Sequence, residues 1–142
     1  MRVLFDLSFL IAIFDEEHLH HERAQLWWDD NRDYGWASCP LTQNGVVRVL
    51  SQPTYSHPVS IAEAFEILAE QIARTDHVFW PDDLSLLDPG VIDHTHVLGP
   101  KQLTDIYLLA LAVKNGGRLA TFDRTIPLGA VRAAEPRHLA VV

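Results

Sequence analysis

The sequence of 142 residues contains a single cysteine, Cys39. One cysteine forms no disulfide within the chain, and its apolar neighbours indicate a small buried side chain in a reducing compartment rather than a catalytic thiol. Long hydrophobic runs are also missing, since none approaches the roughly 18 to 20 residues that span a bilayer. The apolar stretch 7–14 lacks the basic leader and the small-residue cleavage site of a secretory signal. We therefore expect a cytoplasmic protein with no membrane anchor.

Basic side chains are scarce, eleven against nineteen acidic ones, and the formal net charge is −8. Because Lys and Arg neutralise phosphates, this balance argues against broad nucleic acid binding. The charge is unevenly spread: residues 1–100 carry five basic and sixteen acidic side chains, whereas residues 101–142 carry six basic and three acidic ones. An acidic pocket beside the more basic C-terminal third could accept a polyanion at one place and repel it elsewhere.

Hydrophobic content of 48% fits one domain, 1–142, whose core needs no disulfide. Short apolar segments alternate with helical patterns, which predicts an α/β domain with a mostly parallel central sheet and helices on both faces. The predicted strands are 3–5, 36–39, 77–80, 118–122 and 139–142. The predicted helices are 8–14, 20–31, 43–51, 61–74 and 103–115. Residues 84–100 give a weak signal, typical of an irregular segment with a short helix.

Two of these helices carry more specific predictions. Thr42 precedes the helix 43–51 and is predicted to be its N-cap, because a hydroxyl there accepts from a free backbone N–H group. In the helix 61–74 the apolar residues recur at helical spacing. That spacing predicts a helix with Ala64, Phe65, Leu68 and Ile72 on one side and with Glu63, Glu66 and Glu70 on the other.

Three aspartates lie where the predicted elements meet. Asp6 follows the strand 3–5, Asp123 follows the strand 118–122, and Asp105 is in the first turn of the helix 103–115. Ligands of open α/β sheets bind outside the carboxyl ends of the strands, so we expect the three carboxylates to converge there. Each aspartate alone also fits a strand-end turn or a helix N-terminus. Ser8 fits either a hydroxyl ligand or an N-cap.

Clustered carboxylates repel one another unless a cation neutralises them. Two or three carboxylates with open coordination positions suit Mg²⁺ or Mn²⁺ rather than Zn²⁺. Such a cation polarises a phosphate and generates a hydroxide for in-line attack. The pattern therefore predicts hydrolysis of a phosphodiester. Haloacid-dehalogenase phosphatases need a second aspartate where this chain has Ser8, and receiver domains need an acidic pair near the first strand, so neither fits.

Weaker candidates remain outside this group. The histidines invite a zinc interpretation, but no cysteine or H-x-x-x-H pair accompanies them. Trp27 and Trp28 fit either base stacking or, more commonly for adjacent tryptophans on a helix, packing in the core or at an interface. The histidines in question are His18, His20, His21, His94 and His96.

Four ordered motifs resemble the VapC type of PIN-domain proteins, and the similarity covers nearly the whole chain. They are Leu4-Phe5-Asp6-x-Ser8-x-Leu10, Pro40-Leu41-Thr42-Gln43-Asn44-Gly45-Val46-Val47-Arg48, Gln102-Leu103-Thr104-Asp105-x-Tyr107-Leu108-Leu109-Ala110 and Ala120-Thr121-Phe122-Asp123. The resemblance implies a PIN-like fold and a Mg²⁺- or Mn²⁺-dependent endoribonuclease toxin. It also implies an RNA substrate, a VapB-like antitoxin as partner, and a homodimer.

By the same resemblance, Asp6, Asp105 and Asp123 are the metal-site residues, and position 43 completes the catalytic set. The family pattern Thr-Glu-Asn-Gly has a glutamate where this chain has Gln43. Glutamine keeps the shape and an acceptor oxygen but carries no charge. We therefore expect weaker metal affinity and reduced or absent cleavage. The exchange fits engineered inactivation or natural degeneration, and the alternative function is a catalytically silent module that binds the antitoxin.

Overall fold

The computed structural model describes all 142 residues, and its centre is a five-stranded sheet in which every neighbouring pair is parallel. The strand order is β3-β2-β1-β4-β5, so the first strand of the chain is the middle strand of the sheet. This confirms the predicted parallel α/β architecture. The strands are β1 (Val3–Phe5), β2 (Trp36–Ser38), β3 (His77–Phe79), β4 (Arg118–Thr121) and β5 (Leu139–Val141).

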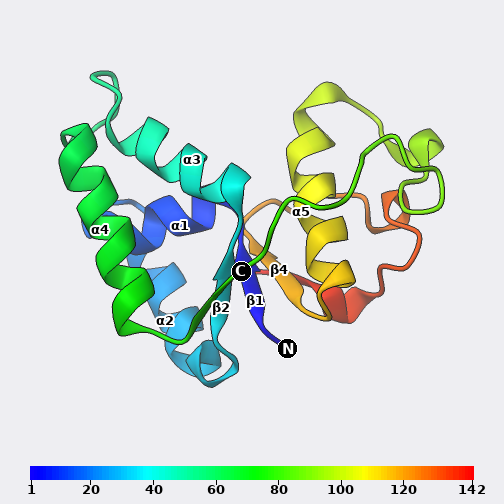
Figure 1. Cartoon of the computed structure of the whole chain (residues 1–142), viewed down its shortest axis with the longest axis horizontal. Coiled ribbons are helices and arrows are strands. Elements are labelled where there is room, and N and C mark those ends of the chain that lie inside the picture. The colour runs from blue at the N-terminus through cyan, green and yellow to red at the C-terminus, as the bar shows by residue number, and fades with distance from the viewer.

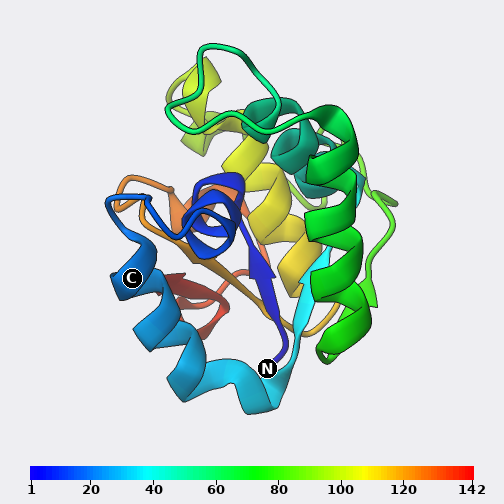
Figure 2. The ribbon, with the colours of Figure 1, turned by 90° about the vertical axis from the view of Figure 1, so that its left-hand side faces the viewer.

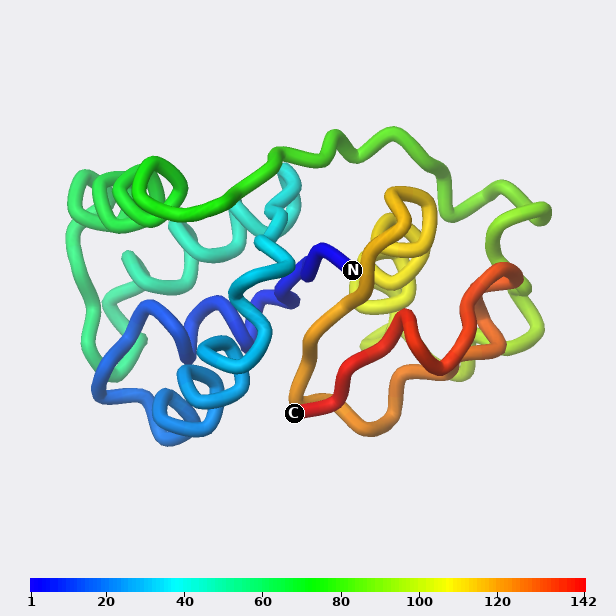
Figure 3. Tube along the Cα trace, turned by 90° about the horizontal axis from the view of Figure 1, so that it is seen from below, coloured from blue at the N-terminus to red at the C-terminus, as the bar shows by residue number.

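Helices cover both faces of the sheet, as Figures 1 and 3 show. One face packs against four helices in a cluster that includes Phe5, Phe9 and Trp36, and the other packs against α5 in a cluster that includes Leu4 and Leu109. Figure 2 views the four-helix side, where α1 lies between α2 and α4. The helices are α1 (Leu7–Phe14), α2 (His21–Asn31), α3 (Pro40–Leu50), α4 (Ile61–Arg74) and α5 (Leu103–Lys114).

The pairing of β1 with β4 sets the position of the candidate site. Leu4 pairs with Leu119 and Phe5 with Ala120, so the carboxyl ends of the two strands lie side by side. The N–H group of Asp6 extends the ladder by donating to the carbonyl oxygen of Ala120 at 3.1 Å. Residues that follow β1 and β4 are therefore brought to one edge of the sheet, as a parallel ladder requires.

The prediction that Thr42 is the N-cap of α3 is wrong, and of the two alternatives left open for Ser8 the structure excludes the N-cap. Helix α3 begins at Pro40, because proline is favoured in the first helical turn, so Cys39 occupies the N-cap position and Thr42 lies inside the helix. Ser8 is exposed and does not cap α1. The cap is Asp6, whose side chain accepts a hydrogen bond from the N–H group of Phe9.

The predicted apolar face of α4 is only partly buried. Ala64 and Leu68 are buried, whereas Phe65 is 60% exposed and Ile61 is 61% exposed. The apolar stripe of α4 is thus wider than the surface that the rest of the domain covers. Part of it is left facing a groove beside α3.

The region before α5 is irregular, as the weak sequence signal predicts. It contains two short 3₁₀ turns, His94–His96 and Pro100–Gln102, and no longer helix. Helix α5 ends before the predicted glycine stop, where Gly116 has a φ of +68° that other residues rarely adopt. None of the helices combines the length and the apolar character needed to cross a bilayer.

Candidate active site

Asp6 is the most buried of the charged candidates, with 3% of its surface exposed. Its Oδ1 accepts from the N–H group of Phe9 at 2.8 Å, and its Oδ2 accepts from the hydroxyl of Thr121 at 2.5 Å. Burial, together with the charges of Asp105 and Asp123, raises the pKa of Asp6 to about 6, and the two hydrogen bonds limit the rise. A nearby cation would stabilise the charged form of this buried carboxylate.

Thr121 is a site residue that the sequence reasoning missed. Its buried hydroxyl donates to Asp6 and also accepts from the backbone N–H group of Asp123 at 2.9 Å. One side chain therefore connects the residue after β1 with the residue that lies two positions beyond the end of β4. The only signal in the sequence was a hydroxyl two residues before an aspartate, and its role depends on the pairing of two strands.

The other two aspartates are half-buried and lie close enough to affect one another electrostatically. Burial and the charge of Asp123 raise the pKa of Asp105. In contrast, the hydroxyl and the N–H group of Thr125 both donate to Oδ1 of Asp123 and lower its pKa. Asp123 thus stays charged, and its second oxygen has no protein donor. The structure brings all three predicted aspartates to one place.

Gln43 faces a different set of partners. Its Nε2 donates to Oγ of Ser38 at 3.0 Å, and the same oxygen lies 2.7 Å from Nε2 of His77. Since Gln43 supplies a proton to Ser38, the serine hydroxyl is free to donate to an unprotonated His77. Burial and the charge of Arg2 lower the pKa of His77, which favours that neutral ring. No hydrogen bond joins Gln43 to an aspartate.

The three aspartates are not the tightest group of ligand-type side chains. That group is Asp15, Glu17 and His57, whose ligand atoms all lie within 4.8 Å of one another. There, however, the two ring nitrogens of His57 face different carboxylates, at 3.4 Å from Asp15 and 3.0 Å from Glu17, so the ring bridges the two acidic side chains. The carboxylates of Asp6, Asp105 and Asp123 are less tightly grouped than these three side chains. Binding a cation between the three aspartates therefore requires Asp105 and Asp123 to turn towards Asp6.

The donor set still fits a hard divalent cation. Three carboxylates, one of them buried and repelled by the other two, offer oxygen ligands without the sulfur or histidine that zinc prefers. Asp6 is held rigidly by two donors, each of which leaves its oxygen a further lone pair. The residues therefore fit Mg²⁺ or Mn²⁺.

The remaining sequence candidates lie elsewhere. His21 contacts the carbonyl oxygen of Ala12, and His94 contacts that of Leu86, so these rings have backbone partners and the five histidines form no shared site. Trp28 is buried with its ring edge-on to Phe5, and Trp27 packs edge-on against Phe9. Trp28 is thus a core residue, and Trp27 is partly buried and packs against the core.

Replacing Thr121 by valine is expected to destabilise the protein by about 1–3 kcal/mol at pH 7, because a buried carboxylate and a backbone N–H group lose their partner. Urea unfolding would measure the change. Thr121→Ser, which keeps the hydroxyl, is the control and should stay close to the original stability. Equal losses in both variants would show that the methyl group, not the hydrogen bonds, carries the effect.

Comparison with known proteins adds family membership to this geometry. Residues 3–130 match the PIN domain family. The chain is 49% identical over 142 residues to Ribonuclease VapC44 of Mycobacterium tuberculosis (strain ATCC 25618 / H37Rv), covering 100% of both chains. It is 40% identical over 121 residues to Ribonuclease VapC38 of the same strain, covering 84% of both.

Solved structures agree on the fold. The crystal structure of Mycobacterium tuberculosis VapC20, described as a toxin that cleaves the sarcin-ricin loop, has a TM-score of 0.59 at 14% identity and covers 94% of this chain and 99% of its own. VapBC2 from Rickettsia felis, bound to a promoter DNA fragment, gives 0.60 at 8% identity, covering 100% and 99%. With the acidic edge of the sheet and the full-length similarity taken together, this chain belongs to the PIN-domain family and, within it, to the VapC-type proteins.

Proposed function

We propose that this protein is the endoribonuclease toxin of a VapBC-type module and hydrolyses RNA phosphodiester bonds with Mg²⁺ or Mn²⁺. The observation that carries the proposal is the buried, destabilised carboxylate of Asp6 beside Asp105 and Asp123, in a chain that matches ribonucleases over its full length. Bound there, a divalent cation would polarise the scissile phosphate and activate water.

The surroundings of each aspartate give it a different role in the proposed site. Asp6 is the fixed ligand, because the N–H group of Phe9 and the hydroxyl of Thr121 hold it in one orientation. Asp123 contributes a charged oxygen at the same edge, and Asp105 brings the third carboxylate from the opposite face of the sheet. Because its RNA substrate and its antitoxin would be made in the same cell, we propose that the protein acts in the cytoplasm.

The direct test is cleavage of total RNA with Mg²⁺ or Mn²⁺, compared with the same reaction in EDTA. Asp105→Asn should remove the metal-dependent cleavage, since it takes one charge from the site. Asp30→Asn is the matched control, because Asp30 is an exposed residue of α2. Cleavage that survives in Asp105→Asn, or that persists in EDTA, would contradict the proposal.

Gln43 favours a second candidate, a PIN domain that binds the antitoxin but does not cut. The position lacks the charge that the family pattern has, and its amide is engaged with Ser38. Calorimetric titration with Mg²⁺ separates the two functions. Clear binding supports a retained enzyme site, whereas no binding supports the silent module.

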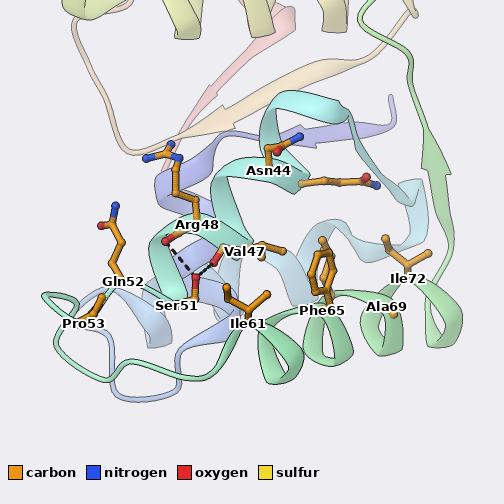
Figure 4. Close-up of a pocket in the computed structure, with 12 residues that line it drawn as sticks. Asn44, Val47, Arg48, Ser51, Gln52, Pro53, Ile61, Phe65, Ala69 and Ile72 are labelled. Atoms are coloured by element: carbon orange, nitrogen blue, oxygen red, sulfur yellow. Dashed lines mark hydrogen bonds between the residues drawn. The ribbon is translucent and has the colours of Figure 1, made fainter.

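We also propose that the antitoxin docks in the groove between α3 and α4. The groove has a volume of about 650 Å³. Figure 4 shows Ile61, Phe65 and Ile72 pointing from α4 towards α3, with Arg48 at the far wall. Apolar side chains at this spacing accept the apolar face of an amphipathic helix. Residues Glu63, Glu66 and Glu70 on the outer side of α4 would favour basic residues along the edge of that helix.

Phe65→Ala is expected to weaken the antitoxin complex by about 2 kcal/mol, or roughly thirtyfold in Kd, because an exposed aromatic ring in the groove is a typical energetic anchor. Titration of a VapB-type antitoxin into each variant would measure it. Leu26→Ala is the matched control, since Leu26 on α2 is also 60% exposed but lies outside the groove. Similar losses in both variants would place the antitoxin elsewhere.

The family resemblance further supports a homodimer. Light scattering after size exclusion would measure the mass of the chain without its antitoxin. A mass near twice 16.0 kDa is the expected result, and a mass that stays at 16.0 kDa at high concentration would contradict it.

A further inference from the structure

The basic side chains of this acidic protein fall into two groups. Six of the eleven form ion pairs with carboxylates, namely Arg2, Arg32, Arg74, Lys114, Arg132 and Arg137. The other five have no such pair, although the chain has nineteen acidic side chains. A shortage of carboxylates does not explain this. The unpaired ones are Arg23, Arg48, Lys101, Arg118 and Arg124.

Two of the unpaired cations flank the candidate active site along the chain. Arg124 directly follows Asp123 and is exposed. Lys101 is also exposed and lies in the 3₁₀ turn that leads into α5, four residues before Asp105. A hydrogen bond joins the two segments, since Nε2 of Gln102 donates to the carbonyl oxygen of Thr125 at 3.2 Å.

Arg23 reaches the same region from α2. Its guanidinium carbon lies 4.7 Å from the ring centre of Phe122, the residue before Asp123. That ring is itself fixed, since it stacks on Phe9 at 5.3 Å and meets the ring of His20 at 5.1 Å. A guanidinium lying over an aromatic face keeps its N–H groups at the edge of the ring, free for a phosphate.

The two other unpaired arginines lie in other parts of the fold. Arg118 begins β4, at the opposite end of the strand from Asp123, and its guanidinium contacts Asn31 and the rings of Trp27 and Tyr34. Arg48 lines the groove between α3 and α4. The cations that remain without an ion pair, in or against the segments next to Asp105 and Asp123, are therefore Arg23, Lys101 and Arg124.

We propose that Arg23, Lys101 and Arg124 form a phosphate-binding rim that holds the RNA backbone on either side of the scissile phosphate. The inference rests on the proposed ribonuclease function and adds the residues that bring a polyanion to a chain of net charge −8. Three local cations attract the backbone at this edge, while the rest of the acidic surface repels it and limits binding elsewhere. The carboxylates then meet only the phosphate that the rim presents.

The test is binding of a fluorescein-labelled, mixed-sequence single-stranded RNA to the full chain at several KCl concentrations. Ca²⁺ is present to neutralise the carboxylates, and the RNA is checked on a denaturing gel afterwards. Arg23→Gln, Lys101→Gln and Arg124→Gln should each weaken binding about threefold to tenfold and lower the salt slope by about 0.7, the value for one phosphate contact on a single strand. Arg23→Lys should keep the slope.

Matched controls remove the same charge from paired arginines. Arg137 pairs with Glu135 at 2.9 Å and Arg74 with Glu70 at 2.6 Å, both away from the aspartates. Arg137→Gln and Arg74→Gln should leave affinity within about twofold and the slope unchanged. If the three rim variants behave like these controls, the rim is wrong while the ribonuclease proposal stands. If the unaltered chain does not bind RNA, both are wrong.

Discussion

Gln43→Glu is expected to raise metal-dependent RNA cleavage by about 10²- to 10⁴-fold, the usual contribution of a positioned acid or base. The change gives position 43 the negative charge of the family pattern without altering side-chain volume. It also replaces an amide that donates to Ser38 by a carboxylate that only accepts. Without a cation the carboxylate can accept from the hydroxyl of Ser38, whereas a bound cation would draw it away.

The measurement is cleavage of total RNA by the chain and by Gln43→Glu, with Gln43→Glu/Asp6→Asn as the control for contaminating nuclease. Activity confined to the single variant would mean that one position disables an intact nuclease site. If neither protein cuts, although both are folded and free of antitoxin, the antitoxin-binding function gains support. Equal activity in both would show that position 43 is not catalytic.

The same substitution should change the titration of His77. With a glutamate at position 43, Ser38 could donate to the carboxylate and accept from the ring of His77 instead of donating to it. The added negative charge near the ring favours its protonated form, so the pKa of His77 should rise from its present lowered value. NMR titration of the ring would measure the shift. An unchanged pKa would mean that the new carboxylate has left the serine altogether.

Asp6→Asn is expected to abolish metal-dependent cleavage and yet to stabilise the protein at neutral pH. The pKa of Asp6 is about 6 in the fold, against 3.8 as its ordinary value, so the native state binds this proton more tightly than the unfolded chain. The contribution of Asp6 to stability should therefore be fully present below pH 4, fall between pH 4 and 6, and be lost above pH 6. The loss is at most about 3 kcal/mol, from 1.36 kcal/mol per pKa unit.

Asparagine removes this penalty, since it stays neutral and its oxygen can still cap α1. It cannot accept from both Phe9 and Thr121 with one oxygen in place of two, so the net gain at pH 7.5 should be about 1–2 kcal/mol. Urea unfolding in EDTA at pH 4 and pH 7.5 would measure it. The difference in unfolding free energy between Asp6→Asn and the unaltered protein should be larger at pH 7.5 than at pH 4. A variant that is equally destabilised at both pH values would contradict this account.

Mg²⁺ provides an independent check on the same carboxylate. A ligand that binds only the folded state raises stability by RT ln(1 + [L]/Kd). At pH 7.5 the cation should stabilise the unaltered protein and leave Asp6→Asn nearly unchanged. If both respond equally, the cation binds elsewhere, with Asp15, Glu17 and His57 as the alternative group.

The sequence was sufficient for the framework because its strands are short, apolar and bounded by clear helix patterns. The positions of Asp6 and Asp123 at one sheet edge follow from parallel pairing, and Asp105 joins them from the first turn of α5. The exposure of Phe65 could not be predicted, since helical spacing says which side of a helix is apolar but not how much of that side a neighbour covers.

Side-chain partners were the part that could not be predicted. Thr121 acquires its role only when β4 pairs with β1, more than a hundred residues away in the chain. Gln43 was expected among the aspartates, and whether it turns to them or to Ser38 depends on the hydroxyl at the end of β2 and on His77 in β3. Such competition between partners is decided by tertiary packing.

The central place of β1 in the sheet has a consequence for synthesis on the ribosome. Asp6 is made before β4, which carries Thr121, leads to Asp123 and follows α1–α5 in the chain. The four-helix side can collapse early, because N-terminal segments fold first during translation. The three aspartates come together only when β4 pairs with β1. A nascent chain could therefore not act on the RNA around it until β4 is in place.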